Sequence, residues 1–332
     1  MSSFSNKKNS KRRSNNLNVQ ELDMITETPK KKHIPFGEAL ERFLDDCEIR
    51  NLRSHTIKFY RNELGHFYKI LKEQGIDTAP NNVTSEIIKR NIIVYLKEKE
   101  ARTVSINTKL RAIRAFFNFL YNEGAVKKNP VKGIQLLKDR QKAVATFTNE
   151  QLDKLFKQPD LRTFTGVRDY TILSLLLETG IRANECVHIR LKDISPSNIL
   201  IRHTKGYKER FVPITDNMYK LLKKYLAVRG TVENDYLFIT IDETPLSKRQ
   251  LQNRITKYGK DAKIEGVRCS AHTFRHTFAK LSVKAGADIF TLQAILGHTS
   301  MEMVRNYVNL FSEDVLEKHK NFSPLKNVKG RI

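Results

Sequence analysis

The 332-residue sequence lacks three features that would place it in common classes of protein. No apolar run approaches the roughly 18 residues that a membrane-spanning helix needs, so a membrane span is not expected. The three cysteines, Cys47, Cys186 and Cys269, are far apart and form no Cys-x-x-Cys pair, which argues against a disulfide framework or a zinc knuckle. The N-terminal residues lack the apolar core of a secretory signal. These absences predict a soluble protein of the reducing cytoplasm.

Acidic residues are also scarce. The chain has 36 Asp and Glu against 60 Lys and Arg, a formal net charge of +24. Such an excess favours a polyanionic partner, because neutralised phosphates release counterions. Nucleic acid is the leading candidate, and an anionic membrane surface is a weaker one, because the basic residues are spread along the whole chain. Residues 1–33 hold eight basic and three acidic residues, which predicts a disordered basic arm that is either a solvated tail or a phosphate contact.

The length predicts two domains. Residues 34–128 repeat apolar residues at helical spacing, which predicts a small bundle of helices. The expected helices are Phe36–Cys47, a second one capped by Ser54, Thr84–Glu100 and Ser105–Glu123. Residues 129–147 are basic and punctuated by Pro and Gly, and they predict an interdomain linker.

Residues 148–322 form the predicted second domain, followed by a tail at 323–332. The domain opens with a Thr-x-x-Gln capping box at Thr148, and a long buried helix is expected from Gly166 to Glu185 with a break near Gly180. The runs NILIRH and RFVPI flank TKGYKE and predict a hairpin, with a third strand at Tyr236–Thr240. Helices are expected again at 247–260, 272–285, 289–296 and 300–310. The predicted fold class is therefore mainly α with a small β-sheet (α+β).

Six polar residues of this second domain draw attention together. They are Arg182, Lys205, His272, Arg275, His298 and Tyr307. Each alone has an ordinary explanation, such as a solvated lysine or a core tyrosine. Their local contexts, in chain order, are LLLETGIRANE, TKGYKERFVP, HTFRHTFA and LGHTSMEMVRNY.

These motifs resemble those of the tyrosine recombinase family, which includes lambda integrase, Cre and the Xer recombinases. The resemblance covers the whole second domain, and the helical bundle and linker before it are similar to the family's SAM-like DNA-gripping domain. The resemblance implies a C-shaped clamp on duplex DNA, with Tyr307 as the nucleophile. It also implies that Glu185, three residues after Arg182, is a supporting acid. Lys205 would be the hairpin lysine of the family, with Lys208 in the same turn as an alternative.

The chemistry of these residue types agrees with the resemblance. Two guanidiniums such as Arg182 and Arg275 can stabilise a five-coordinate phosphate without a metal, and His298 can add a hydrogen bond. His272 can accept the proton of the tyrosine, whose ordinary pKa is about 10, and the lysine can protonate the leaving 5′ oxygen. Because the resulting 3′-phosphotyrosyl bond conserves the phosphodiester energy, neither ATP nor a divalent metal is expected.

The resemblance further implies a homotetramer on synapsed DNA, in which the C-terminal helix is exchanged in trans, and possible accessory directionality proteins. Arg111 and Arg114 lie off the apolar stripe of their helix and are weaker candidates for DNA contacts, with a plain solvated face as the alternative.

Several functions remain open. The basic tail favours the integrase or resolvase of a mobile element, bacterial or phage-encoded, over a housekeeping Xer resolvase of chromosome dimers. A type IB topoisomerase and a catalytically silent DNA-binding protein are further alternatives. A DDE-type nuclease is disfavoured, since no carboxylate trio stands out.

Overall fold

The computed structural model describes residues 16–17, 34–138, 145–202 and 209–297 of the chain. The chain divides into two compact units between Gln141 and Lys142, and each unit is described by itself. Helices dominate both units, and the described ranges contain one two-stranded sheet. The predicted mainly α fold with a small β-sheet is therefore confirmed. No helix in these ranges has both the length and the apolar character needed to cross a bilayer.

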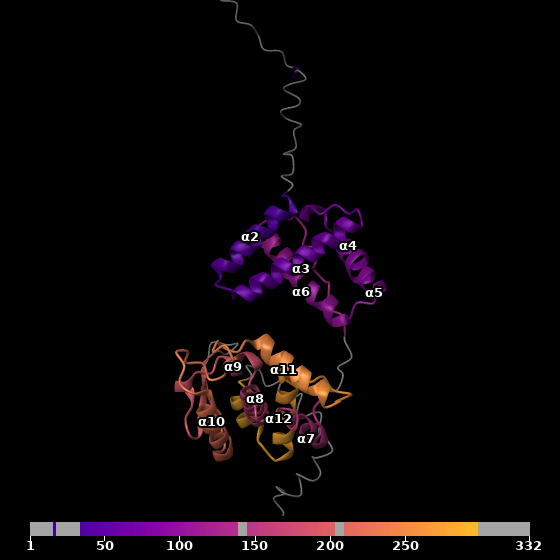
Figure 1. The fold of residues 1–332 in the computed structure, drawn as a ribbon. Coiled ribbons are helices and arrows are strands. Elements are labelled where there is room, and N and C mark those ends of the chain that lie inside the picture. The colour runs from indigo at the N-terminus through magenta and orange to yellow at the C-terminus, as the bar shows by residue number, and fades with distance from the viewer. Residues whose placement is uncertain (1–15, 18–33, 139–144, 203–208, 298–332) are drawn as a thin grey trace, which may run out of the picture. The chain divides into compact units, whose positions relative to one another are not determined.

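The first unit is a helical bundle (Figure 1). Its elements are α2 (Phe36–Ile49), α3 (Ser54–Glu73), a short 3₁₀ turn at Pro80–Asn82, α4 (Ser85–Ile87), the π-helical stretch η2 (Ile88–Val94), α5 (Tyr95–Glu98) and α6 (Thr103–Asn122). Helices α2, α3 and α6 pack against one another. The core between them combines aliphatic residues with a group of phenylalanines, and the rings of Phe116 and Phe117 meet edge to face at 5.2 Å between centroids. The apolar stripes of the sequence thus form this core.

Helix starts in this unit differ from the predicted ones by a residue or two. Ser54 is the first residue of α3 and does not cap it, because Arg53 holds the cap position without a side-chain hydrogen bond. Thr84 does cap the third helical run, and its hydroxyl accepts from the backbone N–H of Ile87 at 3.2 Å. That run continues through η2, where the carbonyl of Asn91 accepts a hydrogen bond from the Gln74 side chain at 2.8 Å.

Part of the predicted linker packs onto the helical bundle. Val131 and Ile134 are buried in its core, and the side chain of Asn107 bonds both the N–H and the carbonyl of Leu137, at 2.8 and 2.9 Å. At the other end, Phe147 is buried in the second unit, where its N–H donates to Thr277 Oγ1 at 2.9 Å. The ends of the segment 129–147 are therefore anchored in different units.

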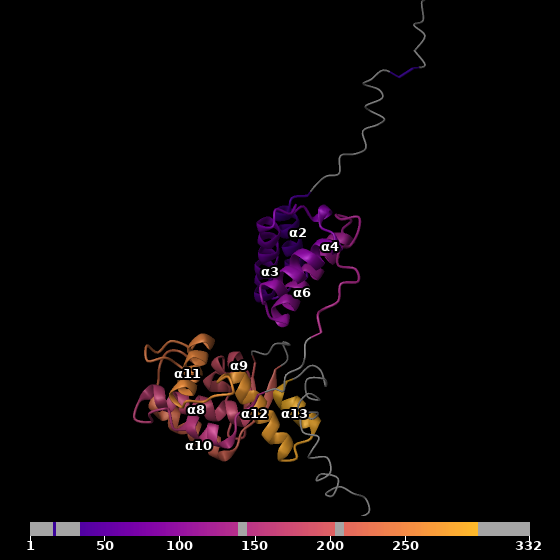
Figure 2. The ribbon, with the colours of Figure 1, turned by 90° about the vertical axis from the view of Figure 1, so that its right-hand side faces the viewer.

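The second unit is arranged around a buried helix, α8. Its elements are α7 (Asn149–Phe156), α8 (Phe164–Thr179), α9 (Ala183–Val187), a 3₁₀ turn at Leu191–Asp193, β1 (Asn198–Ile201), β2 (Arg210–Pro213), α10 (Asp216–Arg229), α11 (Lys248–Asp261), α12 (Ala271–Lys284) and α13 (Ile289–Leu296). Both α10 and α12 pack on α8 (Figure 1), and α13 lies beside α12 (Figure 2). The capping box from Thr148 to Gln151 and the helix break at Gly180 are both confirmed.

The predicted hairpin is present, but the predicted third strand is wrong. Strands β1 and β2 pair antiparallel, with Ile199 opposite Val212. The run Tyr236–Thr240 makes only isolated bridges within the described residues. Side chains satisfy much of its backbone instead: Tyr225 donates to the carbonyl of Leu237 at 3.1 Å, and Arg168 donates to that of Ile239 at 2.8 Å. The β-like apolar pattern therefore marks a buried loop.

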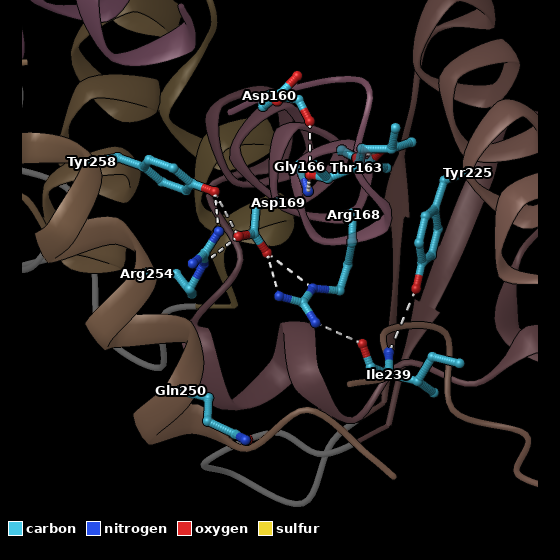
Figure 3. Close-up of polar contacts among 12 residues, drawn as sticks. Asp160, Thr163, Gly166, Arg168, Asp169, Tyr225, Ile239, Gln250, Arg254 and Tyr258 are labelled. Atoms are coloured by element: carbon cyan, nitrogen blue, oxygen red, sulfur yellow. Dashed lines mark hydrogen bonds and ion pairs between the residues drawn. The ribbon is translucent and has the colours of Figure 1, made fainter. Parts of the chain in front are cut away.

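A buried charge network joins α8 to α11 (Figure 3). Asp169 on α8 is 3% exposed and accepts hydrogen bonds from Arg168, Arg254 and the Tyr258 hydroxyl, which lies 2.7 Å from Oδ2. Burial of the phenol, followed by the charge of Asp169, raises the pKa of Tyr258, so the phenol stays a donor. One buried carboxylate therefore binds the buried Arg168, the partly exposed Arg254 and a phenol.

Replacing this carboxylate should destabilise the second unit. We expect Asp169→Asn to lower the free energy of unfolding by roughly 3 kcal/mol, because it leaves the buried guanidinium of Arg168 and the partly exposed one of Arg254 without a counter-charge. Urea unfolding followed by circular dichroism measures the change. Asp160→Asn is the matched control, because Asp160 pairs with Arg162 at the surface and its loss should leave the unfolding midpoint unchanged. Equal effects of the two substitutions would refute the importance of the buried network.

Candidate active site

The structure describes four of the seven residues predicted for the site, which comprise the six candidates and the supporting acid. Arg182 precedes α9, Glu185 lies on α9, and His272 and Arg275 lie on the first turns of α12. The remaining candidates, including the alternative lysine, lie outside the described residues; they are Lys205, Lys208, His298 and Tyr307. No group of three His, Cys, Asp or Glu side chains that could share a metal ion occurs in the described ranges.

The end of α8 is where several elements meet. Gly180 has φ of +61°, and a Cβ built there would contact Phe278 of α12 and, at 2.9 Å, Leu296 of α13. A side chain is therefore excluded by both the left-handed backbone and the neighbouring helices. Arg182, the cap residue of α9, follows two residues later. The close packing at Gly180 therefore fixes the backbone position of Arg182.

Arg275 ties this helix end to a second one. Its side chain is buried, and it donates to the carbonyl of Gly180 at 2.8 Å and to that of Leu296 at 2.7 Å. These carbonyls lie at the C-terminal ends of α8 and α13, where a positive charge is favoured by the helix dipole. Since Gly297 ends α13 with φ of +62°, Arg275 fixes the point from which the chain continues to His298.

Glu185 holds Arg182 from the next turn. Its Oε2 accepts from the backbone N–H of Arg182 at 2.9 Å and its Oε1 accepts from Arg182 Nη1 at 2.8 Å. The carboxylate side chain is 1% exposed, whereas the Arg182 side chain is 22% exposed. The acid is thus enclosed, while part of the Arg182 side chain that it orients is exposed.

Arg210 is a member of this cluster that the sequence analysis missed. It lies on β2 and donates to both oxygens of Glu185, from Nη1 at 3.1 Å and from Nη2 at 2.8 Å. A signal for it exists in the strand pattern: Val212 is buried and Phe211 is 66% exposed, so position 210 shares the inward face. A charged residue on the inner face of a strand requires a buried partner, and Glu185 is that partner.

The four hydrogen bonds keep Glu185 ionised. Burial on its own raises the pKa of this carboxyl, but the hydrogen bonds and charges of Arg210, followed by those of Arg182, outweigh burial and lower the pKa below its ordinary value. A group whose pKa is lowered on folding stabilises the fold above its ordinary pKa, and this contribution disappears as pH falls through the lowered value. At neutral pH the cluster therefore holds one negative and two positive charges.

His272 lies among the cations of the site. Partial desolvation of the ring, then the charges of Arg275, Lys248, Arg182 and Arg268, lower the pKa of its imidazole. The pKa of His276, one turn further along α12, is lowered by burial and by its neighbours His272 and Arg275. At neutral pH the His272 ring is therefore uncharged and able to accept a proton.

Comparison with known proteins agrees with this geometry. The family model described as the phage integrase family matches residues 145–314, and the phage integrase N-terminal SAM-like domain matches residues 40–124. A relative named tyrosine recombinase XerC, from Oceanobacillus iheyensis, is 30% identical over 87% of this chain and 96% of its own length. Another XerC, from Thermodesulfovibrio yellowstonii, is 32% identical over 82% of this chain and 91% of its own.

Solved structures show the same fold. A XerH site-specific recombinase bound to a palindromic difH substrate superposes with a TM-score of 0.67 at 22% identity, covering 88% of this chain and 85% of that one. A lambda integrase tetramer bound to a Holliday junction gives 0.69 at 18% identity, covering 85% and 82%. The chain therefore belongs to the phage integrase family of tyrosine recombinases. It is a site-specific recombinase similar to XerC, an enzyme that breaks and rejoins DNA through a phosphotyrosine intermediate.

The lowered pKa of His272 predicts the acid side of the pH profile. If this imidazole accepts the proton, the second-order rate of covalent complex formation should stay level from about pH 8 to 6.5 and fall only below its ordinary pKa of about 6.5, where the ring becomes protonated. His272→Gln should be slower at neutral pH and lose that fall. Rates at subsaturating DNA report the free enzyme, and His66→Gln, an exposed histidine of the other unit, should keep the wild-type profile. An unchanged acid limb in His272→Gln would contradict the assignment.

Proposed function

We propose that Tyr307 attacks the scissile phosphodiester of a duplex recombination site while Arg182, Arg275 and His298 bind its phosphate. The observation that carries this proposal is the junction of α8 and α13. Arg275 bonds the carbonyl two residues before Arg182 and the carbonyl two residues before His298. One guanidinium therefore holds together two chain segments that are distant in sequence, which supports a common site for Arg182, Arg275 and His298.

The two arginines have different surroundings, which fits different tasks at the phosphate. Arg275 is 4% exposed and uses both terminal nitrogens on backbone carbonyls, so its charge is fixed in place. Arg182 is restrained through Nη1 and its side chain is more exposed. Preorganised guanidiniums stabilise the charge that develops on a five-coordinate phosphate without reorganisation during the reaction. We assign Arg275 to the inner side of the phosphate and Arg182 to its solvent side.

The proton transfers follow from the charges of the site. The neutral His272 accepts the phenolic proton of Tyr307 as the oxygen bonds to phosphorus. The bond to the 5′ oxygen breaks, and Lys205 gives that oxygen a proton; Lys208 is the alternative donor. The products are a 3′-phosphotyrosyl bond and a free 5′-hydroxyl. Attack by another 5′-hydroxyl reverses these steps, so strand exchange needs neither ATP nor a metal ion.

The substrate that this chemistry requires is duplex DNA. We propose that the helical unit and the catalytic unit close on duplex DNA as a C-shaped clamp. Arg111 and Arg114 are exposed on α6, which leaves both available for phosphate contacts. The solved relatives include a recombinase tetramer on a Holliday junction, which supports a tetramer for this chain, with accessory directionality proteins as possible further partners. A type IB topoisomerase would instead relax plasmids that lack any recombination site.

The biological role that we propose is movement of a mobile element, supported by the basic residues before Phe36. Housekeeping resolution of chromosome dimers is the second candidate, and the observation behind it is the similarity to a XerC over 96% of that protein's length. The DNA that flanks the gene distinguishes the two roles, because element ends adjoin an integrase gene and are absent from a housekeeping locus.

The central assignment predicts a covalent intermediate. On a nicked suicide duplex that carries the recombination site, the wild-type chain should form a protein–DNA adduct that survives a denaturing gel. Tyr307→Phe should abolish the adduct, because the ring lacks the attacking oxygen. Tyr219→Phe removes a hydroxyl from α10 and is the control that should retain it. Added EDTA should leave the wild-type adduct unchanged. A band that persists in Tyr307→Phe would exclude Tyr307 as the nucleophile.

The C-terminal segment gives a second prediction. Residues 312–332 contain the apolar pair Val315 and Leu316, and we propose that this segment docks in trans on a neighbouring protomer. Removal of these residues should leave binding to a single site intact and reduce synapsis of two sites, measured by native gel electrophoresis of paired duplexes. Undiminished synapsis by the truncated chain would refute the exchange.

A further inference from the structure

The inner face of β2 carries a side chain whose hydrogen bonds reach two parts of the active site, α9 and the end of α13. Arg210 donates to Glu185 through two nitrogens and, through Nε, to the carbonyl of Ile295 at 2.8 Å. Its side chain is 12% exposed and that of Glu185 is 1% exposed. Each guanidinium nitrogen of Arg210 therefore donates to a group of the protein itself.

The bidentate contact determines how strongly Glu185 attracts Arg182. A buried carboxylate needs a counter-charge, and the two-point contact with Arg210 supplies it. Arg182 then needs only Nη1 to be held by the carboxylate. Without Arg210, the full charge of Glu185 would fall on Arg182, which would neutralise and redirect the guanidinium that binds the phosphate.

The third hydrogen bond of Arg210, from Nε, fixes the last turn of α13. Arg210 binds the carbonyl of Ile295, and Arg275 binds that of the next residue, Leu296. A Cβ built at Gly297 would lie 3.0 Å from the Arg210 Cζ atom, so the guanidinium lies directly against this glycine. The two arginines come from different elements, and together they fix the helix end that precedes His298.

We propose that Arg210 is a positioning residue of the active site, which leaves the charge of Arg182 available for the phosphate and fixes the end of α13. This inference rests on the proposed roles of Arg182 and His298. It also connects them with the hairpin, because Arg210 is the first residue of β2, the second strand of that hairpin. A displacement of about 1 Å in such a group can reduce a rate by about 100-fold.

The test separates chemistry from binding. Arg210→Gln should slow adduct formation at saturating DNA by about 100-fold, as expected for a displaced catalytic group, with an unchanged Kd for the uncleaved site. Arg210→Lys should recover only part of the rate, because one ammonium cannot bind both carboxylate oxygens and the carbonyl of Ile295. Arg254→Gln is the matched control: it removes another arginine from a buried carboxylate, Asp169, and its folded fraction should cleave at the wild-type rate.

A double variant tests the route through Glu185. Glu185→Gln combined with Arg210→Gln leaves no buried carboxylate unpaired, so it should fold even where the single Arg210 variant does not. Its rate loss should be smaller than the product of the two single losses, because both act on Arg182. The proposal would be overturned if the rate loss of the double variant equalled the product of the two single losses. A wild-type rate in folded Arg210→Gln would also overturn it. Failure of the wild-type chain to form an adduct would instead count against the proposed function.

Discussion

A carboxylate that is almost fully removed from water must be compensated, and the surroundings of Glu185 show how this requirement organises the active site. Two guanidiniums from different elements, Arg182 before α9 and Arg210 on β2, converge on its oxygens. Without these partners the carboxylate would be an uncompensated buried charge, which typically costs about 3 to 5 kcal/mol. The position of the hairpin relative to α9 is therefore tied to the ionisation of a single acid. The cluster keeps a surplus positive charge, which a phosphate can use.

Helix ends provide the second constraint. α8 and α13 both end at glycines in the left-handed region, Gly180 and Gly297, and such an end leaves backbone carbonyls without partners inside the helix. Arg275 binds one carbonyl from each end. Arg275, which is predicted to act on the substrate, thus also joins the helix end before Arg182 to the helix end before His298. Its substitution should alter positions as well as charge, so the loss of activity cannot be assigned to the phosphate contact alone.

The sequence predicted those parts that depend on local periodicity and on glycine. The helices of the bundle, the break at Gly180 and the stop at Gly297 follow from side-chain spacing and from the one residue type that adopts positive φ at little cost. It failed at Tyr236–Thr240, because an apolar run looks the same in a strand and in a buried loop whose backbone is bonded by Tyr225 and Arg168. It also missed Arg210, whose partner is 25 residues away in the chain, since spacing on one element cannot reveal a contact between two.

The scarcity of acids has a structural counterpart in the second unit. Three of its acids are buried, Asp169, Glu185 and Asp193, and each contacts at least one arginine side chain. Arg229 and Arg275 are also buried, and backbone carbonyls accept hydrogen bonds from both. An arginine suits this use, because its planar group stays charged and offers several donors in fixed directions. Within the described ranges, the same interior also holds three arginines, Arg168, Arg229 and Arg275, so the buried acids and arginines are equal in number. The basic excess of the chain is therefore left to residues outside this core, where a polyanion can bind.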